Sequence, residues 1–317
     1  MSGNEKNLVT TGAGLVWRHQ RILWWVFGVN FVLGLMGTMG ARAAFSRVLD
    51  HSLAAQKISG QVRIISLIDL LAKPDVQMPA LAAPSIAFQV VFFVFMLFVA
   101  GGILSVYRED RRLAVPEFFE ACGLYFWRFF RLMLISLIPF AIATALYLGV
   151  GKISEKVGEA SPYESHAFWV RAIGGLIVIL LWLFVRLWFD VAQVRAVAQN
   201  ERGMWRNTFR ALRISSRAVG MLLWLYFRIS LVAWVVLIAG IWLWLRIPGT
   251  AFSASWLLLE VVLLIQIAVR LWQRASCIAW YKLYAEEHPA AAVEFTTPKP
   301  AEIVDSAPAS TAAPAES

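Results

Sequence analysis

The sequence has few charged residues for its length. They make up 15% of the 317 positions, whereas hydrophobic residues make up 60%. In a soluble domain about a quarter of the residues are charged. A water-soluble particle could not hide this much apolar surface, because its exterior needs polar cover. The composition therefore excludes an ordinary soluble protein and favours one that lipid solvates.

Motifs for catalysis, metal binding and nucleotide binding are also absent from the sequence. The four histidines show no spacing typical of metal ligands, and there is no Gly-x-Ser-x-Gly, His-Glu-x-x-His or Walker-type loop. The only cysteines, Cys122 and Cys277, are expected on the cytoplasmic side, where disulfides are rare. We therefore predict no metal and no cofactor. The sequence favours a non-enzymatic protein.

Six apolar runs are long enough to cross a membrane. A bilayer core of about 30 Å requires about 20 apolar residues in an α-helix. We therefore predict an all-α, polytopic membrane helix bundle with six transmembrane helices, within a domain at 17–284. The predicted spans lie at about 22–41, 86–106, 132–150, 172–194, 218–245 and 256–276.

Arginine and lysine are concentrated on one side of these spans. If the N-terminus is cytoplasmic, the basic residues favour the cytoplasmic side by roughly two to one. The positive-inside rule then predicts that both the N- and C-termini are cytoplasmic. The net charge of +9 is explained as an orientation signal, and no nucleic-acid partner is expected. The first run exceeds the apolar core of a signal peptide, so we expect a retained anchor.

The segments outside the spans divide by composition. Residues 1–16 are polar and are predicted to be a flexible N-terminus, and residues 285–317 are predicted to be a disordered cytoplasmic tail. The loop at 44–84 holds two apolar clusters and is predicted to form an outer two-helix cap. Segments around Pro116 and Trp205 are predicted to be two cytoplasmic interfacial elbow helices.

Four arginines share one face of the second elbow, because they follow one another in steps of four, three and four. They are Arg206, Arg210, Arg213 and Arg217. Trp205 and Phe209 occupy a neighbouring face, as in helices that lie in the membrane interface. The arginines could bind anionic lipid headgroups or a phosphate-bearing substrate. They could also serve only to orient and anchor the chain.

Polar residues inside the predicted spans are the other candidates, because charge in lipid is costly. They are Asn30, Arg186, Asp190, Gln193, Arg228, Glu260, Gln266 and Arg270. Asp190 could pair with Arg186 along the fourth span or with Arg270 on the sixth. Such a pair could be a structural clamp or an entry gate for a polar substrate. Glu260 could hydrogen-bond Asn30, or could couple to protons if no cation reaches it.

One part of the sequence resembles a known group of proteins. The stretch Phe189-Asp-Val-Ala-Gln-Val-Arg-Ala196 and the arginine-rich elbow after it resemble a pattern in uncharacterised six-span bacterial membrane proteins. These are similar to the membrane domain that accompanies some glycerophosphodiester phosphodiesterases. Val115-Pro-Glu-Phe118 is similar to their first elbow, and the resemblance covers about Ile86 to Leu245. It implies a bacterial inner-membrane protein, and it transfers no catalytic residue because the phosphodiesterase barrel is absent.

Three classes of function remain open on the sequence alone. The first is a structural or lipid-handling protein whose partners are membrane lipids with anionic headgroups. The second is a small-molecule or proton-coupled transporter, which requires a water-filled cavity that reaches Asp190 or Glu260. The third is an intramembrane enzyme, which requires two or more acids or histidines that converge on one pocket.

Overall fold

All long regular elements in the described part of the chain are α-helices. The computed structural model describes residues 2–49, 78–160, 163–248 and 251–288. Six helices in these ranges are long and apolar enough to cross a membrane, which confirms the predicted all-α class with six spans. The helices are α1 (Ser2–Arg18), α2 (Gln20–Leu49), α5 (Met78–Glu109), α6 (Val115–Ala160), α7 (Glu164–Ala198), α8 (Met204–Arg217), α9 (Val219–Trp244) and α10 (Phe252–Glu287).

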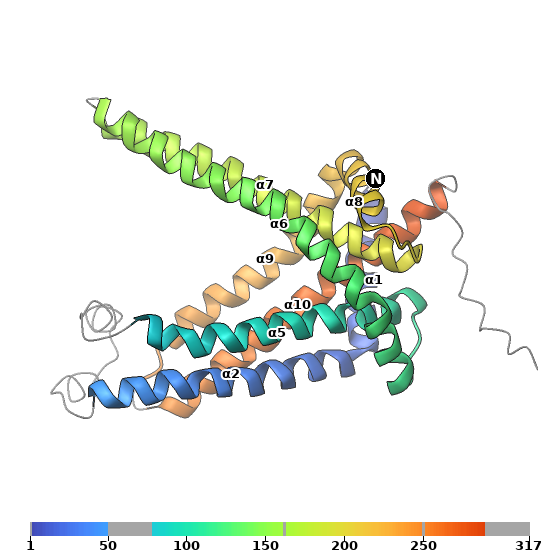
Figure 1. The fold of residues 1–317 in the computed structure, drawn as a ribbon, viewed down its shortest axis with the longest axis horizontal. Coiled ribbons are helices and arrows are strands. Elements are labelled where there is room, and N and C mark those ends of the chain that lie inside the picture. Colours follow the sequence, from blue (N-terminus) through green and yellow to red (C-terminus); the bar gives the residue numbers. More distant parts are fainter. Residues whose placement is uncertain (1, 50–77, 161–162, 249–250, 289–317) are drawn as a thin grey trace, which may run out of the picture.

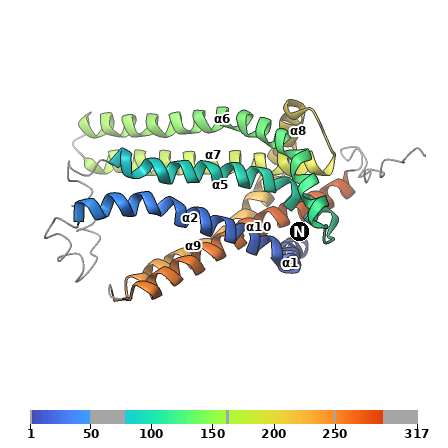
Figure 2. The ribbon, with the colours of Figure 1, turned by 60° about the horizontal axis from the view of Figure 1, so that its bottom comes forward.

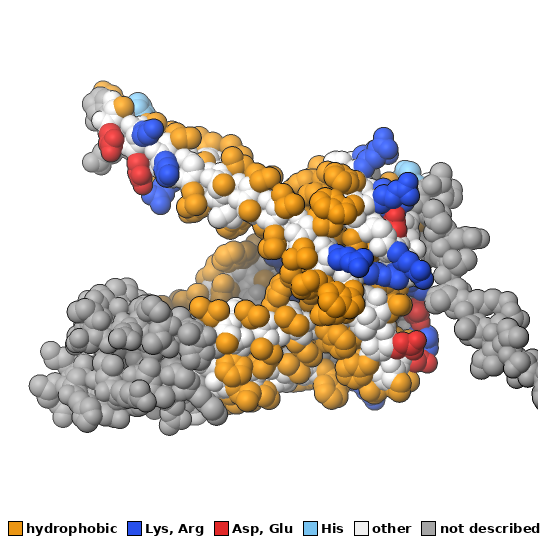
Figure 3. All heavy atoms as spheres, in the orientation of Figure 1, with side chains coloured by type: hydrophobic (Ala, Val, Ile, Leu, Met, Phe, Trp, Pro, Cys, Tyr) orange, Lys and Arg blue, Asp and Glu red, His pale blue; other side chains and the backbone are white. Residues whose placement is uncertain are grey.

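The long helices associate as three antiparallel pairs, α2 with α5, α6 with α7, and α9 with α10 (Figure 1). The pairs meet at one end of the molecule. We call this the basic end, and it carries α1, α8 and the α5–α6 turn at residues 110–114. Away from the basic end the α6–α7 pair diverges from the other two pairs, and the space-filling view shows a hollow between them (Figure 3).

The buried core lies where the pairs meet. Five helices each contribute a large apolar side chain that is at most 1% exposed. These side chains are Leu104, Phe129, Leu187, Leu222 and Leu271. Each comes from the half of its helix that is closer to the basic end, so the tertiary packing is concentrated there.

The far halves of the same helices are apolar and exposed. Large side chains there keep roughly 60% of their surface accessible, which water solvates poorly and hydrocarbon solvates well. Examples are Leu148 on α6, Ile177 on α7, Ile238 on α9 and Leu257 on α10. The fold is therefore compatible with an integral membrane protein, in which lipid surrounds the diverging pairs.

The N-terminal segment differs from the expectation of a flexible stretch, because it forms α1. This helix packs along α10, where Leu8 and Leu15 are buried. The indole N–H of Trp272 donates to the carbonyl of Val9 at 2.8 Å. The two leucines are seven residues apart and share one helix face, so their burial offsets the entropy lost on ordering the segment.

The two predicted elbow helices differ in the structure, because one is a separate helix and the other is part of a longer helix. The second is α8, which ends at Arg217 and is separated from α9 only by Ala218. The first is the beginning of α6 and continues into the third span as one bent helix (Figure 2), because no proline lies between Pro116 and the start of the predicted span. Most of the predicted outer cap at 44–84 and nearly all of the predicted tail at 285–317 lie outside the described residues.

Replacing Gly12 with leucine should detach α1 from α10. A Cβ atom on Gly12 would lie 2.1 Å from Ser276 Oγ and 2.9 Å from the Ser276 backbone nitrogen. Such overpacking costs about 1–3 kcal/mol. We expect Gly12→Leu to lower the melting temperature of the detergent-solubilised protein. Gly14→Leu is the matched control, because nothing lies within 4 Å of a Cβ atom there. Equal melting temperatures for the two variants would contradict this packing.

Candidate functional site

A buried ion pair joins α7 to α10. Asp190 is 5% exposed, and both of its carboxylate oxygens accept hydrogen bonds from the guanidinium of Arg270, each at 3.1 Å. The hydroxyl of Tyr226 on α9 donates to the same carboxylate at 3.1 Å. The structure therefore forms the Asp190–Arg270 pair between helices that the sequence made plausible, and it adds a third helix through Tyr226.

A glutamine connects this pair to a second arginine. Gln273 Oε1 accepts hydrogen bonds from Arg186 at 2.9 Å and from Arg270 at 3.3 Å. Gln273 Nε2 donates to Ser230 Oγ at 2.9 Å. Arg186 thus bonds to α10, and not to Asp190 one turn away on its own helix. The polar residues converge because Gln266, Arg270 and Gln273 share one face of α10.

The cluster holds more positive than negative charge. Arg186 and Arg274 lie close enough to Asp190 for their charges to act on it, in addition to Arg270. Three arginines therefore surround one aspartate, which leaves two positive charges in excess. Arg274 is buried, and its Nε and Nη1 atoms have no hydrogen-bond partner in the part of the chain that the structure describes. Uncompensated buried charge is costly, so the cluster favours the approach of an anion.

A pocket of about 360 Å³ opens beside the cluster, between α7, α9 and α10. Arg186, Arg270 and Gln273 form its polar side together with Ser230 and Gln266. Its volume falls within the range of small-ligand sites, which is roughly 300–1,000 Å³. We call it the inner pocket.

The inner pocket is equipped to bind an anion. Arg270 keeps 31% of its side chain accessible, whereas Asp190 keeps only 6%. A guanidinium carries five N–H donors, and Arg186 and Arg270 use only some of them within the protein. None of the residues that line the pocket is acidic. Phosphate and carboxylate groups are the anions that paired arginines recognise best.

The apolar side of the inner pocket lies on α9. Leu237 and Trp234 line it, and Trp234 is 61% exposed. Gln266 donates its amide N–H to the Ala233 carbonyl at 2.9 Å, which fixes α10 against α9 beside the pocket. Helices α7 and α10 therefore supply most of the polar lining of the pocket, and α9 supplies most of the apolar lining.

Other sequence candidates lie apart from the inner pocket. Asn30 and Gln193 are half-buried, and neither bonds to the Asp190 cluster within the described ranges. Arg228 is half-buried on α9 and does not line the pocket. Glu260 Oε2 is buried without a hydrogen-bond partner among the described residues, so the structure forms no bond from that oxygen to Asn30.

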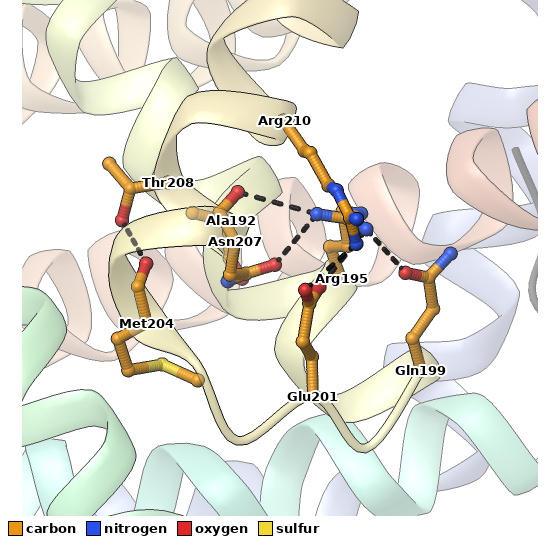
Figure 4. A network of polar contacts seen from close by, with 8 residues as sticks. All are labelled: Ala192, Arg195, Gln199, Glu201, Met204, Asn207, Thr208 and Arg210. Carbon is orange, nitrogen blue, oxygen red and sulfur yellow. Dashed lines mark hydrogen bonds and ion pairs between the residues drawn. The ribbon is translucent and has the colours of Figure 1, made fainter.

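A second polar network attaches α8 to the end of α7 (Figure 4). Arg195 is 3% exposed and forms an ion pair with Glu201 at 3.0 Å, while Glu201 also pairs with Arg210 at 2.9 Å. Asn207 accepts from Arg195 at 3.3 Å and donates to the Ala192 carbonyl at 2.8 Å. This network fixes the face of α8 that lies against α7.

Helix α8 also has an exposed face. Arg210 belongs both to this face and to the network, because it pairs with Glu201 and keeps 52% of its side chain accessible. All four elbow arginines, Arg206, Arg210, Arg213 and Arg217, are exposed. Trp205 and Phe209 are 59% and 62% exposed. Exposed arginines beside exposed aromatic rings are typical of a helix that lies in a membrane interface.

Sequence reasoning missed Tyr226, Ser230, Arg195 and Arg274 as members of the polar clusters. Tyr226 and Ser230 are four residues apart on α9, so the sequence does indicate that they share one polar helix face. Arg195 and Arg274 lie near the ends of predicted spans, where the positive-inside rule alone explains an arginine. Nothing in their spacing reveals that they are buried, because that depends on which neighbouring helices cover them.

Comparison of the chain with protein-family models, with curated proteins and with solved structures finds no match. The resemblance to the membrane domain of the phosphodiesterases therefore stays a prediction. In the described part of the chain, no three histidine, cysteine, aspartate or glutamate residues form a group that could hold a metal ion.

Replacing Asp190 with alanine should be strongly destabilising. The change leaves the buried arginines without their carboxylate, and breaking such a pair costs about 3–5 kcal/mol. Adding Arg270→Ala to Asp190→Ala should cost little more, because the interaction is already lost. Thermal unfolding in detergent of the two single variants and the double variant measures the coupling. Fully additive losses would show that the pair makes no energetic contribution.

Proposed function

We propose that the protein is a multi-pass integral membrane protein that handles lipids and binds an anionic lipid headgroup in the inner pocket. We further propose that it resides in a bacterial inner membrane with both termini in the cytoplasm, so that the basic end faces the cytosol. Its role is non-enzymatic. The observation that carries the proposal is the excess of arginine over carboxylate beside a pocket within the spans.

The charge of the inner pocket supports an anionic ligand. Arg186 and Arg270 both line it, and the one carboxylate nearby, Asp190, is already occupied by Arg270 and Tyr226. An anion in the pocket would receive N–H donors from two helices. A cation would meet like charge at close range, which disfavours it.

The surroundings of the pocket favour a lipid as the source of that anion. The pocket residues lie within helices that are long and apolar enough to cross a membrane. Trp234 and Leu237 provide an apolar wall on the side of the pocket formed by α9. A lipid phosphate can occupy the polar side while its chains remain in hydrocarbon, so the chains hold the lipid in the membrane beside the pocket, whereas a free anion has no such anchor.

The other two classes of function receive less support. Neither Asp190 nor Glu260 lines the inner pocket, so the route expected for a proton-coupled transporter is not favoured. An enzyme would need convergent acids or histidines, and the pocket lining contains none of them. The same geometry can hold inorganic phosphate, which the experiment below separates from a lipid headgroup.

Arg186→Gln should weaken the binding of an anionic lipid. Losing a hydrogen bond to a charged group costs about 1.5–3 kcal/mol, or roughly ten- to a hundredfold in affinity. The measurement is the rise in melting temperature of the detergent-solubilised protein on titration with phosphatidylglycerol. Arg228→Gln is the matched control, because it removes one arginine from a span but outside the pocket.

Two further arms of this titration identify the ligand. Phosphatidylcholine and inorganic phosphate should each stabilise the wild type less than phosphatidylglycerol does. Equal stabilisation by inorganic phosphate would assign the pocket to a free anion. If no ligand shifts the wild type, or if Arg186→Gln and Arg228→Gln respond alike, the inner pocket is not the binding site.

We propose in addition that the arginine face of α8 contacts anionic headgroups at the membrane surface. Each arginine near an anionic surface contributes about 1 kcal/mol. Replacing Arg206, Arg210, Arg213 and Arg217 by glutamine should reduce the number of phosphatidylglycerol molecules that remain bound in native mass spectrometry of the purified protein. A control variant with lysine at the same four positions keeps the positive charge, so it should keep the bound phosphatidylglycerol. If the glutamine variant also keeps its lipid, the four arginines have only an orienting role.

A further inference from the structure

A second pocket lies at the basic end, where the α1–α2 corner meets the α5–α6 turn. Its volume is about 490 Å³, and its lining comes from α1, α2, α5, the turn and the first residues of α6. It shares no residue with the inner pocket. We call it the corner pocket.

The walls of the corner pocket are apolar. They include Ile22, Trp25, Val29, Phe95, Val99 and Phe118. Arg21, Trp25 and Val29 follow one another at intervals of four residues, so the α2 wall runs for about 12 Å from the basic end toward the membrane interior. Val106 and Val99 continue the same direction on α5. The pocket is therefore elongated along the helix axes.

The rim of the corner pocket is basic. Arg18, Arg21 and Arg112 line it, and no acidic residue does. Arg18 is paired with Asp110. Arg21 and Arg112 are exposed, and no ion pair engages either of them within the described ranges. Two positive charges without an ion-pair partner among the described residues therefore lie at one end of the apolar corner pocket.

Asp110 holds the two sides of the corner pocket together. It ends α5 in a left-handed conformation with φ 50°, and its amide donates to the Val106 carbonyl at 2.9 Å. Its carboxylate pairs with Arg18 and lies 3.3 Å from the ring nitrogen of His19. Since Arg18 and His19 form the α1–α2 corner, this contact fixes that corner to the α5–α6 turn and keeps the pocket formed.

We propose that the corner pocket binds one chain of an acidic amphiphile, a hydrocarbon chain whose phosphate or carboxylate head contacts Arg21 and Arg112. The apolar walls match the chain, and the basic rim matches the head. The rim lies where α2 and α6 begin and α5 ends, which is the depth of lipid headgroups for helices that span a bilayer. The head can belong to an anionic phospholipid or to a free fatty acid, which share this chemistry.

A bound lipid chain fits this pocket better than a partner helix. An amphipathic helix needs a groove that accepts side chains along several turns. The corner pocket is instead lined by α2, α5 and the start of α6, and its basic residues lie at one end of it. The proposal does not depend on the function of the inner pocket, because the two pockets have separate linings.

Photo-crosslinking of the full-length protein in nanodiscs tests the proposal. The probes are a fatty acid and a phosphatidylglycerol, each with a diazirine in the chain, and a fatty acid methyl ester as the uncharged comparison. We expect labelling of peptides that contain residues 22–29, 95–106 or 115–119. Labelling by only one of the acidic probes would identify the source of the head and still support the site.

Two kinds of variant test the site independently, one by filling the pocket and one by removing the charge of its rim. Val29→Trp should abolish labelling, because it fills the pocket. Arg21→Gln with Arg112→Gln should reduce labelling by the acidic probes about tenfold and leave the methyl ester unaffected. Arg131→Gln with Arg202→Gln is the matched control, because both arginines are exposed and lie outside the pocket lining.

Three results would overturn the proposal. The first is that the crosslinks map only to other segments. The second is that labelling survives Val29→Trp in a protein whose melting temperature is unchanged. The third is that both arginine double variants lose labelling equally. Arg186→Gln should leave this labelling unchanged. A failure of the inner pocket as a headgroup site is therefore distinguishable from a failure of the corner pocket.

Discussion

One buried carboxylate joins two of the three helix pairs at the place where they converge. Asp190 accepts hydrogen bonds from Arg270 on α10 and Tyr226 on α9, so it holds α7, a member of the diverging α6–α7 pair, against the α9–α10 pair. It is also the acid whose charge opposes those of Arg186, Arg270 and Arg274. Without it, the charges of the three arginines would repel one another in a region that water does not screen.

The excess of arginine over carboxylate links this clamp to function. A structural ion pair needs only one arginine for one aspartate, and Arg270 fulfils that role. Arg186 instead reaches the inner pocket and bonds to Gln273, a neutral group that cannot balance its charge. Since an arginine within a span is costly unless it gains a partner, the second arginine favours a ligand that brings negative charge from outside the protein.

The sequence predicts the parts of this structure that depend on periodicity along a single helix. Run length indicates six spans, and the steps between Gln266, Arg270 and Gln273 indicate one polar face that Asp190 could meet. Helix α1 was missed because the polar composition of residues 1–16 indicates a flexible segment. Its order comes from the packing of Leu8 and Leu15 on α10, which local composition does not reveal. The pockets were missed as well, because each is lined by several helices that are distant in sequence, and the angle at which two helices pack depends on contacts across such distant segments.

The two pockets have opposite polarity, and this bears on how the protein would handle a lipid. The corner pocket has apolar walls and a basic rim at the ends of the spans, so the proposed ligand would enter it with its chain. The inner pocket has its arginines within the spans and an apolar wall on α9, so the proposed lipid would be held there by its head. Moving an anionic head from water to the depth of the inner pocket is costly. Arg186 and Arg270 can offset that cost only for a head that lies beside them. A lipid held at the corner pocket therefore keeps its head at the membrane surface, whereas a lipid held at the inner pocket has its head drawn into the bilayer.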